Sequence, residues 1–381
     1  MTKSFDNVII GGGASGLMLA ANIELDGARG IILEGSSCIG SKLLMSGGGR
    51  CNITHGGSIK DFLFAYGDKG PLLRKCLYRH SNADLMKWLE DHGVKLTDEN
   101  GRIFPASMRA RDILDAFHEA AERNGWQIRT GAKVSGLSNE EDHFDVTLEN
   151  GETLGARNVV IATGGITYPE TGSDGSMFKI LKGIGAEITE PRSALAPVYI
   201  EDYPYADLAG ISIKDVTATV LSSDAACICK GKAVSMTGDV LFTHDGLSGP
   251  AILNISGYAE SGGKISLSYN KDLQDLPKRM QRVLQDRARG ESGDIKTTVL
   301  ASLLVHDDFT VRSVDSRGMV TAGGVSLEEL DMHTMRMKRV DGIYVIGEAI
   351  DADGITGGYN LQMCWSTACA AADDIRKNYS V

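Results

Sequence analysis

The 381-residue sequence contains few prolines and few aromatic residues, and it has no long apolar run. No stretch approaches the ~18 apolar residues that a membrane-spanning helix needs, so we expect no membrane span. An acid, Asp6, stands close to the N-terminus, and the chain then enters a predicted strand, so we expect no signal peptide. These absences favour a cytoplasmic protein.

Basic residues are also scarce. Lysine and arginine total 39 against 50 aspartates and glutamates, which gives a formal net charge of −11. A protein that binds nucleic acid generally needs a basic face, so this balance argues against a nucleic-acid partner. The hydrophobic share of 42% is ordinary for a soluble globular chain, and the length predicts two or three domains.

The seven cysteines follow no framework pattern. No C-x-x-C pair occurs, and Cys227 and Cys229 alternate on a predicted strand with no second ligand cluster nearby. Structural zinc needs such clusters, so we predict no metal site. The odd number and irregular spacing also favour a reducing compartment.

Glycine, in contrast, is abundant. The 46 glycines make up about 12% of the chain, against a usual ~7%. They gather at turns beside apolar runs, which is typical of loops that hold a ligand.

The most informative glycines follow the first apolar run. Gly11, Gly13 and Gly16 have the G-x-G-x-x-G spacing between a buried strand and a helical pattern. Gly11 allows the turn, Gly13 lets a pyrophosphate approach the backbone, and Gly16 lets the helix pack on the strand. Glu34 ends the second apolar run 18 residues after Gly16, where an acid binds a ribose hydroxyl. The motif predicts dinucleotide binding; the alternative is a plain βαβ unit whose glycines only serve the turn.

A second glycine-rich stretch covers residues 40–52. Three consecutive glycines are unfavourable inside a helix or strand, so we predict a loop here. Because the apolar residues 43–45 lie beside these glycines, we favour a loop that contacts a ligand over a flexible surface loop.

Two later segments, residues 158–165 and 342–348, resemble the opening strand and its glycines. Apolar runs of this kind are typical of strands buried on both faces of a parallel sheet. Ligands bind beyond the carboxyl ends of such strands, so we expect the three glycine ends to lie together. Helices are predicted at 71–92 and 111–123, strands at 102–105, 127–129, 133–137 and 144–148, and a final helix to about Lys377.

Residues 191–326 differ in character. Short β-rich runs at 198–200, 216–221, 227–230, 240–242 and 264–269 predict an antiparallel sheet or barrel, with helical segments within about 272–306. We therefore expect an α/β fold in which a Rossmann-like domain, made of a parallel sheet and a β-meander, spans residues 1–190 and 327–381. The barrel-like domain is inserted between these two parts.

Taken together, these segments resemble the BaiN-like (YhiN-like) family of FAD-dependent oxidoreductases, within the glutathione reductase and fumarate reductase lineage. The segments that carry the resemblance are IIGGGASGL, KLLMSGGGRCNIT, ATGGITYPETGSDG, FTHDGLSGPAIL, TAGGVSLEELDMHTM and GEAIDADGITGGYNLQMCWSTA.

The resemblance implies FAD as the cofactor. It places the AMP ribose on Glu34 and the pyrophosphate on Gly11 to Gly16, and it gives Glu348 a ribityl and pyrophosphate role. Residues 42–52 and 321–325 would border the ring, and the final helix would begin beside it. The implied cofactor-binding residues are Gly11, Gly13, Ala14, Ser15, Gly16, Glu34, Gly35, Lys42, Ser46, Gly47, Gly48, Arg50, Cys51, Asn52, Val134, Ala162, Thr163, Gly164, Gly324, Gly347, Glu348, Gly358, Asn360 and Leu361.

The candidate catalytic residues are Arg50, Tyr359 and His244, and the last is a candidate proton donor because imidazole titrates near neutral pH. Tyr168 and Arg102 are candidate substrate contacts, whereas Cys51 is interpreted as a packing residue and not as a redox thiol. His244 could equally be structural, and for Tyr168 and Arg102 a structural role is favoured.

The expected chemistry is hydride transfer at flavin N5 with a small organic substrate. We favour reduction of an activated C=C bond with electrons from NADH or NADPH, which would share the substrate pocket because no second dinucleotide motif occurs. The alternatives are an amine oxidase of aminoacetone type that releases hydrogen peroxide, and a flavin-dependent RNA-modifying or sensing protein. The oligomeric state stays open.

Overall fold

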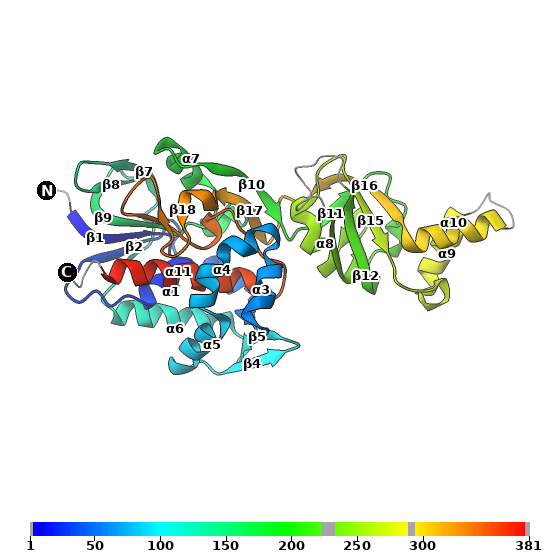
Figure 1. The fold of residues 1–381 in the computed structure, drawn as a ribbon, viewed down its shortest axis with the longest axis horizontal. Coiled ribbons are helices and arrows are strands. Elements are labelled where there is room, and N and C mark those ends of the chain that lie inside the picture. Colours follow the sequence, from blue (N-terminus) through cyan, green and yellow to red (C-terminus); the bar gives the residue numbers. More distant parts are fainter. Residues whose placement is uncertain (1–2, 222–232, 289–293, 378–381) are drawn as a thin grey trace. The chain divides into compact units, whose positions relative to one another are not determined.

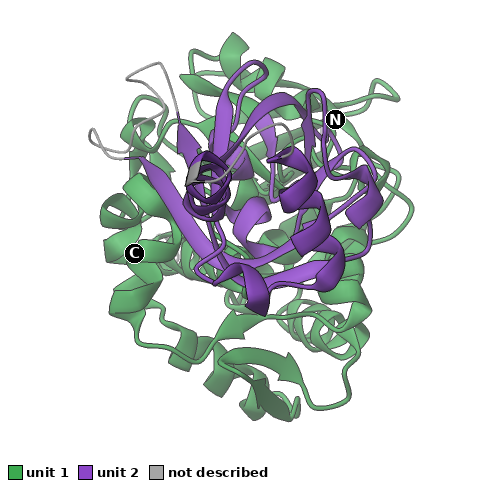
Figure 2. Cartoon of the chain, turned by 90° about the vertical axis from the view of Figure 1, so that its right-hand side faces the viewer, with its two compact units in different colours: residues 1–191, 320–381 green, residues 192–319 purple. Residues whose placement is uncertain are grey.

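The computed structural model describes residues 3–221, 233–288 and 294–377 (Figure 1). The expected strand at 227–230, with Cys227 and Cys229, lies outside these ranges. The chain divides into two compact units, which Figure 2 colours separately. Unit 1 comprises Met1–Pro191 and Val320–Val381, and unit 2 comprises Arg192–Met319.

Unit 1 is built on a sheet in the order β18-β19-β20-β9-β1-β2-β6. Its parallel strands are β1 (Lys3–Ile10), β2 (Gly30–Leu33), β6 (Gln127–Arg129), β9 (Thr153–Ile161) and β20 (Ile343–Val345). Ile10 pairs with both Leu33 and Ile161, and Ile161 pairs with Val345. The register therefore brings the carboxyl ends of β1, β2, β9 and β20 to one edge, as the sequence predicts.

Helices α1 (Ala14–Ala21), α6 (Ala110–Arg123) and α11 (Tyr359–Lys377) pack together beside this sheet (Figure 1). In α6 the apolar residues recur at helical spacing and are buried, whereas the charged residues lie on the opposite side. The antiparallel meander of β7 (Val134–Asn139) and β8 (Phe144–Leu148) continues into β9, and α7 (Ser176–Gly183) packs on β7.

A smaller sheet in unit 1 joins β3 (Thr54–His55), β5 (Arg102–Pro105) and β4 (Leu96–Glu99). The chain between β3 and β4 forms three helices, α3 (Ile59–Ala65), α4 (Gly70–Arg79) and α5 (Asn82–Asp91). The helical stretch predicted at 71–92 is two helices, because Ser81 starts a new one: its side chain and that of Asp84 form a capping box.

One expectation about unit 1 is wrong. Residues 40–52 are not a simple loop, because α2 (Ser41–Met45) and a 3-10 turn (Ser46–Gly49) occupy most of the stretch. The glycines do adopt conformations that other residues disfavour, but they do so in the turn directly after a helix. Gly47 and Gly48 there have left-handed φ values of 57° and 67°.

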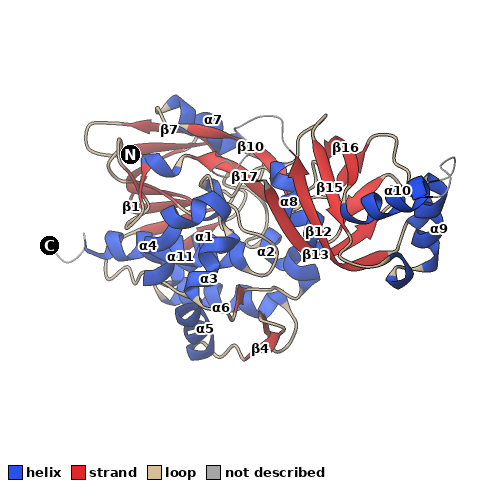
Figure 3. Cartoon of the chain, turned by 45° about the vertical axis from the view of Figure 1, so that its right-hand side comes forward, coloured by secondary structure: helices blue, strands red, loops and turns tan. Residues whose placement is uncertain are grey.

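Unit 2 is a closed six-stranded barrel in the order β11-β14-β13-β12-β15-β16. The strands are β11 (Val198–Ile200), β12 (Ser212–Leu221), β13 (Val234–Phe242), β14 (Gly246–Ser248), β15 (Lys264–Ser268) and β16 (Asp307–Val314). Helices α8 (Pro250–Ile255), α9 (Lys278–Arg287) and α10 (Asp294–Val305) accompany it (Figure 3). The fully buried Asp307 accepts hydrogen bonds from Tyr205, Tyr269 (2.5 Å) and Arg287 (2.6 Å), which fixes α9 to the barrel.

The remaining strands are β10 (Ile188–Ala194), which pairs with β17 (Val320–Val325), and the short β18 (Leu330–Asp331) and β19 (Arg336–Met337). The α/β class, the Rossmann-like part and the inserted barrel are those predicted from the sequence. Among the described residues, no helix is both long and apolar enough to span a bilayer.

Candidate functional site

The turn between β1 and α1 has the geometry that a dinucleotide needs. Gly11 has a φ of 111°, and a Cβ there would lie 2.4 Å from the carbonyl oxygen of Ala162. A Cβ on Gly16 would lie 2.1 Å from the carbonyl oxygen of Gly11, so the helix packs closely on the turn. Gly13, in contrast, faces open space, with no atom within 4 Å of its Cβ position. No side chain caps α1, so its N-terminus is left to bind an anion.

Glu34 lies directly after β2 and is buried. Its two carboxylate oxygens accept hydrogen bonds from the backbone N–H of Gly12 (2.8 Å) and of Ser36 (2.7 Å). These bonds fix the carboxylate beside the glycine turn and leave lone pairs free for a ribose hydroxyl.

Ser173 adds a polar group to the same region. Its hydroxyl is buried and has no hydrogen-bond partner among the described residues. A Cβ on Gly164 would lie 2.9 Å from the Ser173 Oγ, and one on Gly172 would lie 3.3 Å from Glu34 Oε1. An unpaired buried hydroxyl is unfavourable unless a ligand or water pairs with it. This hydroxyl, the open Gly13 and the uncapped helix fit the phosphate and ribose parts of a dinucleotide.

A group of polar side chains, which we call the strand-end cluster, continues from this turn. It consists of Lys42, Thr167, Thr321 and Glu348. Lys42 Nζ donates to both oxygens of Glu348 (2.9 and 2.7 Å) and to Thr167 Oγ1 (2.8 Å). The backbone N–H of Thr321 also donates to Glu348 (2.7 Å). Four distant chain segments therefore meet beyond the ends of β9 and β20.

Two glycines let the backbone approach closely here. A Cβ on Gly347 would lie 2.4 Å from Ser15 Oγ. Gly324 has a φ of 132°, and a Cβ there would lie 2.7 Å from the carbonyl oxygen of Ala349. A side chain at Gly347 would push the end of β20 away from α1, and one at Gly324 would push β17 away from the segment that follows β20.

The turn after α2 leads to Arg50 and Cys51. The exposed Arg50 guanidinium lies 4.9 Å from the centre of the Phe104 ring and 3.5 Å from a carboxylate oxygen of Glu99. Cys51 is fully buried, and burial raises the pKa of its thiol to about 12. Its thiol is neutral at physiological pH, which supports the interpretation of Cys51 as a packing residue.

The start of α11 lies close to β3. Gly358 has a φ of 94°, and a Cβ there would lie 2.6 Å from the backbone of Thr54. With the Asn52 amide oriented to satisfy both of its polar atoms, its oxygen accepts from the Gly358 N–H (3.1 Å) and its nitrogen donates to the Thr54 carbonyl (2.9 Å). Asn360 bonds both the N–H and the carbonyl of Gly354 (2.8 Å each).

Aromatic rings surround the first residue of this helix. The Tyr359 ring stacks on His55, with centroids 5.4 Å apart and an angle of 13° between the planes. Phe62 meets it edge-on at 4.9 Å, and the Tyr66 hydroxyl donates to the Tyr359 carbonyl (2.8 Å). The Tyr359 hydroxyl itself has no hydrogen-bond partner in the described part of the chain.

One face of the small sheet carries His55, Arg102 and Glu99. Arg102 pairs directly with His55 across β3 and β5, and with Glu99 across β4 and β5. Residues paired across antiparallel strands point to the same face. We call His55, Arg102, Glu99, Arg50 and Tyr359 the β5 cluster.

The structure thus places most of the predicted residues in two groups within unit 1. Gly11 to Gly16, Glu34, Lys42, Ala162, Thr163, Gly164, Gly347 and Glu348 lie at the strand ends, whereas Ser46 to Asn52, Gly358 and Tyr359 lie at or beside the β5 cluster. Gly35 contacts Lys133, the buried Val134 begins β7, and Leu361 lies in α11. His244 is exposed in the β13–β14 turn of unit 2.

Sequence reasoning missed Ser173, Thr167, His55 and Glu99. Ser173 and Thr167 lie within the quoted ATGGITYPETGSDG segment, whose glycines and hydroxyl residues were a usable signal. His55 and Glu99 carry no signal of their own, because strand pairing brings them to Arg102 and the packing of other segments brings them to Tyr359 and Arg50.

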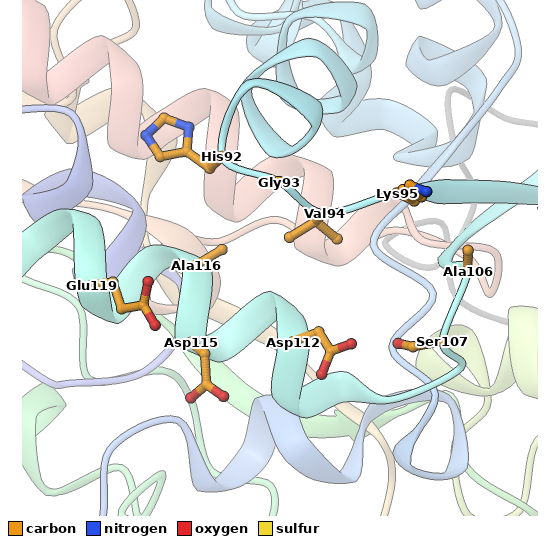
Figure 4. A pocket seen from close by; sticks show the side chains of 10 residues that line it. All are labelled: His92, Gly93, Val94, Lys95, Ala106, Ser107, Asp112, Asp115, Ala116 and Glu119. Atoms are coloured by element: carbon orange, nitrogen blue, oxygen red, sulfur yellow. The ribbon is translucent and has the colours of Figure 1, made fainter.

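A separate open cleft of about 590 Å³ lies between α6 and the segments that follow α5 and β5, and it is lined by His92, Lys95 and three carboxylates of α6 (Figure 4). Two of these carboxylates are paired, Asp112 with Arg109 and Asp115 with Arg111. None of the predicted site residues lines this cleft. No group of three or more His, Cys, Asp or Glu residues within the described ranges could hold a metal ion.

A βαβ unit with an open glycine turn, a buried acid after the second strand and converging strand ends defines a dinucleotide-binding protein of the Rossmann type. The chain belongs to the family described as HI0933-like protein Rossmann domain, which matches residues 5–374. It is 30% identical to a ribosomal RNA dihydrouridine synthase of Escherichia coli K12, with 98% of each chain covered. It is also 27% identical to a 3-dehydro-bile acid delta(4,6)-reductase of Clostridium scindens, covering 95% of this chain and 97% of that one.

Solved structures share the fold. A flavocytochrome c3 fumarate reductase matches with a TM-score of 0.54 and 16% identity, covering 98% of this chain and 78% of that one. A 3-ketosteroid delta1-dehydrogenase of Sterolibacterium denitrificans matches with a TM-score of 0.56 and 12% identity, covering 99% and 100%. The family and the curated relatives identify this chain as an FAD-dependent oxidoreductase.

Proposed function

We propose that this protein reduces a carbon–carbon double bond conjugated to a carbonyl group, with NADH or NADPH as the electron donor. The observation that carries the proposal is the Tyr359 hydroxyl, which has no hydrogen-bond partner among the described residues and lies at the start of α11. The names of the two relatives above support it: one is a delta(4,6)-reductase of a bile acid, and the other is a synthase of dihydrouridine, which is a reduced uridine.

The reduction needs a hydride at one carbon and a proton at its neighbour. FAD, when bound, supplies the hydride chemistry. Glu34, Ser173 and the glycine turn would hold its nucleotide end, and Lys42 and Glu348 would lie along its middle. Tyr359 would supply the proton. Burial raises the pKa of Tyr359 further, so the phenol keeps its proton at neutral pH. A positioned proton donor of this kind contributes roughly 10²–10⁴-fold to a rate.

His55 orients this donor. Burial lowers the pKa of His55, so its ring is neutral at physiological pH. The Gly57 N–H donates to Nδ1 (3.2 Å), which puts the ring proton on Nε2. The neutral imidazole then stacks on Tyr359 and fixes the plane of the phenol without adding a charge of its own.

The sequence holds one dinucleotide motif, so the nicotinamide donor would have to leave before the substrate enters. This predicts ping-pong kinetics, with the donor and the acceptor competing for the same form of the enzyme.

A uridine in RNA is the second candidate substrate, because two dihydrouridine synthase relatives match nearly the whole chain. The net charge of −11 opposes it. In unit 2, however, α9 carries Lys278, Arg279 and Arg282, which are exposed and have no ion pair among the described residues. Binding that weakens steeply with salt and fails when these three become glutamates would favour RNA.

The test uses the FAD-loaded protein without oxygen. NADH or NADPH should bleach the visible flavin spectrum, and 2-cyclohexen-1-one or a uridine-containing RNA should then restore it, with the reduced product identified by mass spectrometry. Tyr359→Phe should leave the bleaching step intact and slow the second step by about 10²-fold or more. Peroxide release with aminoacetone and no reoxidation by either alkene would replace the proposal with the oxidase alternative.

A further inference from the structure

Arg102 lies without a counterion in a site that otherwise pairs its charges. Its guanidinium makes no hydrogen bond and no ion pair with any described residue. The other cation of the β5 cluster, Arg50, is paired with Glu99 and covers the Phe104 ring. Arginine has five N–H donors in a rigid fork. A guanidinium that is not ion-paired, on the same face as His55 and near Tyr359, is therefore suited to bind an oxyanion.

The surroundings of Arg102 point the same way. Strand pairing puts it on the face that holds His55, and Tyr359 stacks on that histidine. The charge of Arg102 acts on both rings. Burial lowers the pKa of His55, with Asp98 opposing and Arg102 adding to the effect, whereas burial and Asp61 raise the pKa of Tyr359 and Arg102 opposes them. Three hydrogen-bond donors, the Tyr359 hydroxyl, His55 Nε2 and the Arg102 guanidinium, therefore share one region, and none of them is hydrogen-bonded to a described residue, although the charges of Asp98 and Asp61 act on His55 and Tyr359.

We propose that Arg102, with His55 and Tyr359, forms an oxyanion site that selects cyclic conjugated ketones and ring carbonyls by holding the carbonyl oxygen as it becomes an enolate. This inference rests on the proposed function. When the β-carbon accepts the hydride that derives from NAD(P)H, the electron pair of the C=C bond moves toward oxygen, and Arg102 pairs with the enolate oxygen. The α-carbon then takes the Tyr359 proton, the C=O bond reforms, and water returns a proton to the phenolate.

Glu99 sets the strength of this site. Its carboxylate faces Arg102 across the strands and is bound to Arg50, so it lowers the positive potential of the β5 cluster. The site is therefore only partly cationic before substrate binds, and removing Glu99 should strengthen it.

The experiment measures an enolate mimic on the FAD-loaded protein. 4-Nitrophenol ionises near neutral pH to a coloured phenolate, so preferential binding of the anion lowers its apparent pKa and is read from the difference spectrum. The wild type should bind the phenolate in preference to the phenol. Arg102→Ala should weaken this binding by about tenfold or more, and Arg102→Lys should restore part of it. Arg111→Ala, which removes an arginine ion-paired on the surface of α6, is the control and should bind as the wild type does.

Glu99→Gln gives an independent arm that does not depend on the stability of the Arg102 variants. It should tighten phenolate binding about two- to fivefold, since it removes a carboxylate that is about half exposed. No phenolate preference in the wild type, unchanged binding in Arg102→Ala, or weaker binding in Glu99→Gln would each overturn the oxyanion site. Phenolate binding that follows the predicted order in a protein that reduces no enone would instead leave the oxyanion site standing and refute the proposed function.

Discussion

The Nζ of Lys42 lies 2.7 Å from one carboxylate oxygen of Glu348 and 2.9 Å from the other. This pair joins α2, near the start of the chain, to the segment that follows β20 near its end. Both side chains are largely buried, so the ion pair is shielded from solvent more than the surface pairs of this chain are. It links two segments that the resemblance assigns to FAD binding.

Lys42→Met should therefore lower both stability and cofactor retention. The variant leaves the Glu348 carboxylate with only Thr167 and the Thr321 N–H as partners. We expect a loss of about 1–3 kcal/mol in the free energy of unfolding, measured by urea denaturation, and a higher FAD dissociation constant. The matched control is Lys87→Met, which breaks the exposed Lys87–Asp91 pair and should cost much less stability. Equal losses in the two variants would contradict a special role for Lys42.

Gly13→Val should separate cofactor binding from folding. A side chain at Gly13 meets no atom within 4 Å, so the FAD-free protein should unfold at nearly the wild-type temperature. The same side chain would occupy the predicted pyrophosphate position and should abolish FAD retention. Gly183→Val, also in open space but at the end of α7, should keep its flavin. A Gly13→Val protein that purifies with full flavin content would refute the phosphate-site assignment.

The cofactor side of the site could be predicted because its signals are local. The glycine spacing and Glu34 lie within one βαβ unit, so a short stretch of sequence contains the geometry. The strand ends at residues 161–164 and 346–348 could be added because each repeats the same buried pattern.

The β5 cluster could not be assembled in that way. Arg50, Arg102 and Tyr359 were recognised singly as candidates, but their relation depends on the pairing of β3, β4 and β5 and on the approach of Gly358 to Thr54. His55 is a lone histidine in sequence, and only the stacking with Tyr359 gives it a role. Residues 40–52 were also mispredicted as a loop, because the apolar residues of α2 offset the unfavourable glycines that follow.

Thiol labelling checks the interpretation of Cys51. Burial raises the pKa of its thiol, and also those of Cys76 and Cys364, to about 12, so none carries thiolate at neutral pH. Brief iodoacetamide treatment of the native protein, followed by peptide mapping, should find label on the exposed Cys38 and none on Cys51. Unfolding in urea should make Cys51 reactive. Rapid labelling of Cys51 in the native protein would revive a redox role.

Acid should destabilise the C-terminal end of α11 through Asp373. The side chains of His80, whose Nε2 lies 3.3 Å from this carboxyl, and of Arg376 and Arg79, which are ion-paired with it, lower its pKa from 3.8 to about 2. A pKa that is lower in the folded state contributes stability above the unfolded value, and this stability is lost as the pH falls toward 2. Asp373→Asn should thus cost about 1–2 kcal/mol at neutral pH, after allowance for solvent screening, and much less near pH 2. Urea unfolding across this range tests it, and a cost independent of pH would contradict it.

Gly358→Ala tests whether the close contact between α11 and β3 matters for catalysis. The new Cβ would lie 2.6 Å from the Thr54 backbone, at a φ of 94°, so the start of α11 and β3 must move apart. This separates Tyr359 from His55, and misplacement of a catalytic group by about 1 Å can cost 10²-fold in rate. We expect a comparable fall in the alkene-reduction step, together with a lower melting temperature. Gly151→Ala is the matched control: its φ is 85°, but its Cβ meets no atom within 4 Å. It bears the same backbone strain, so it should lower the melting temperature without slowing reduction, and equal rate losses in both variants would show that strain, and not the His55–Tyr359 contact, is responsible.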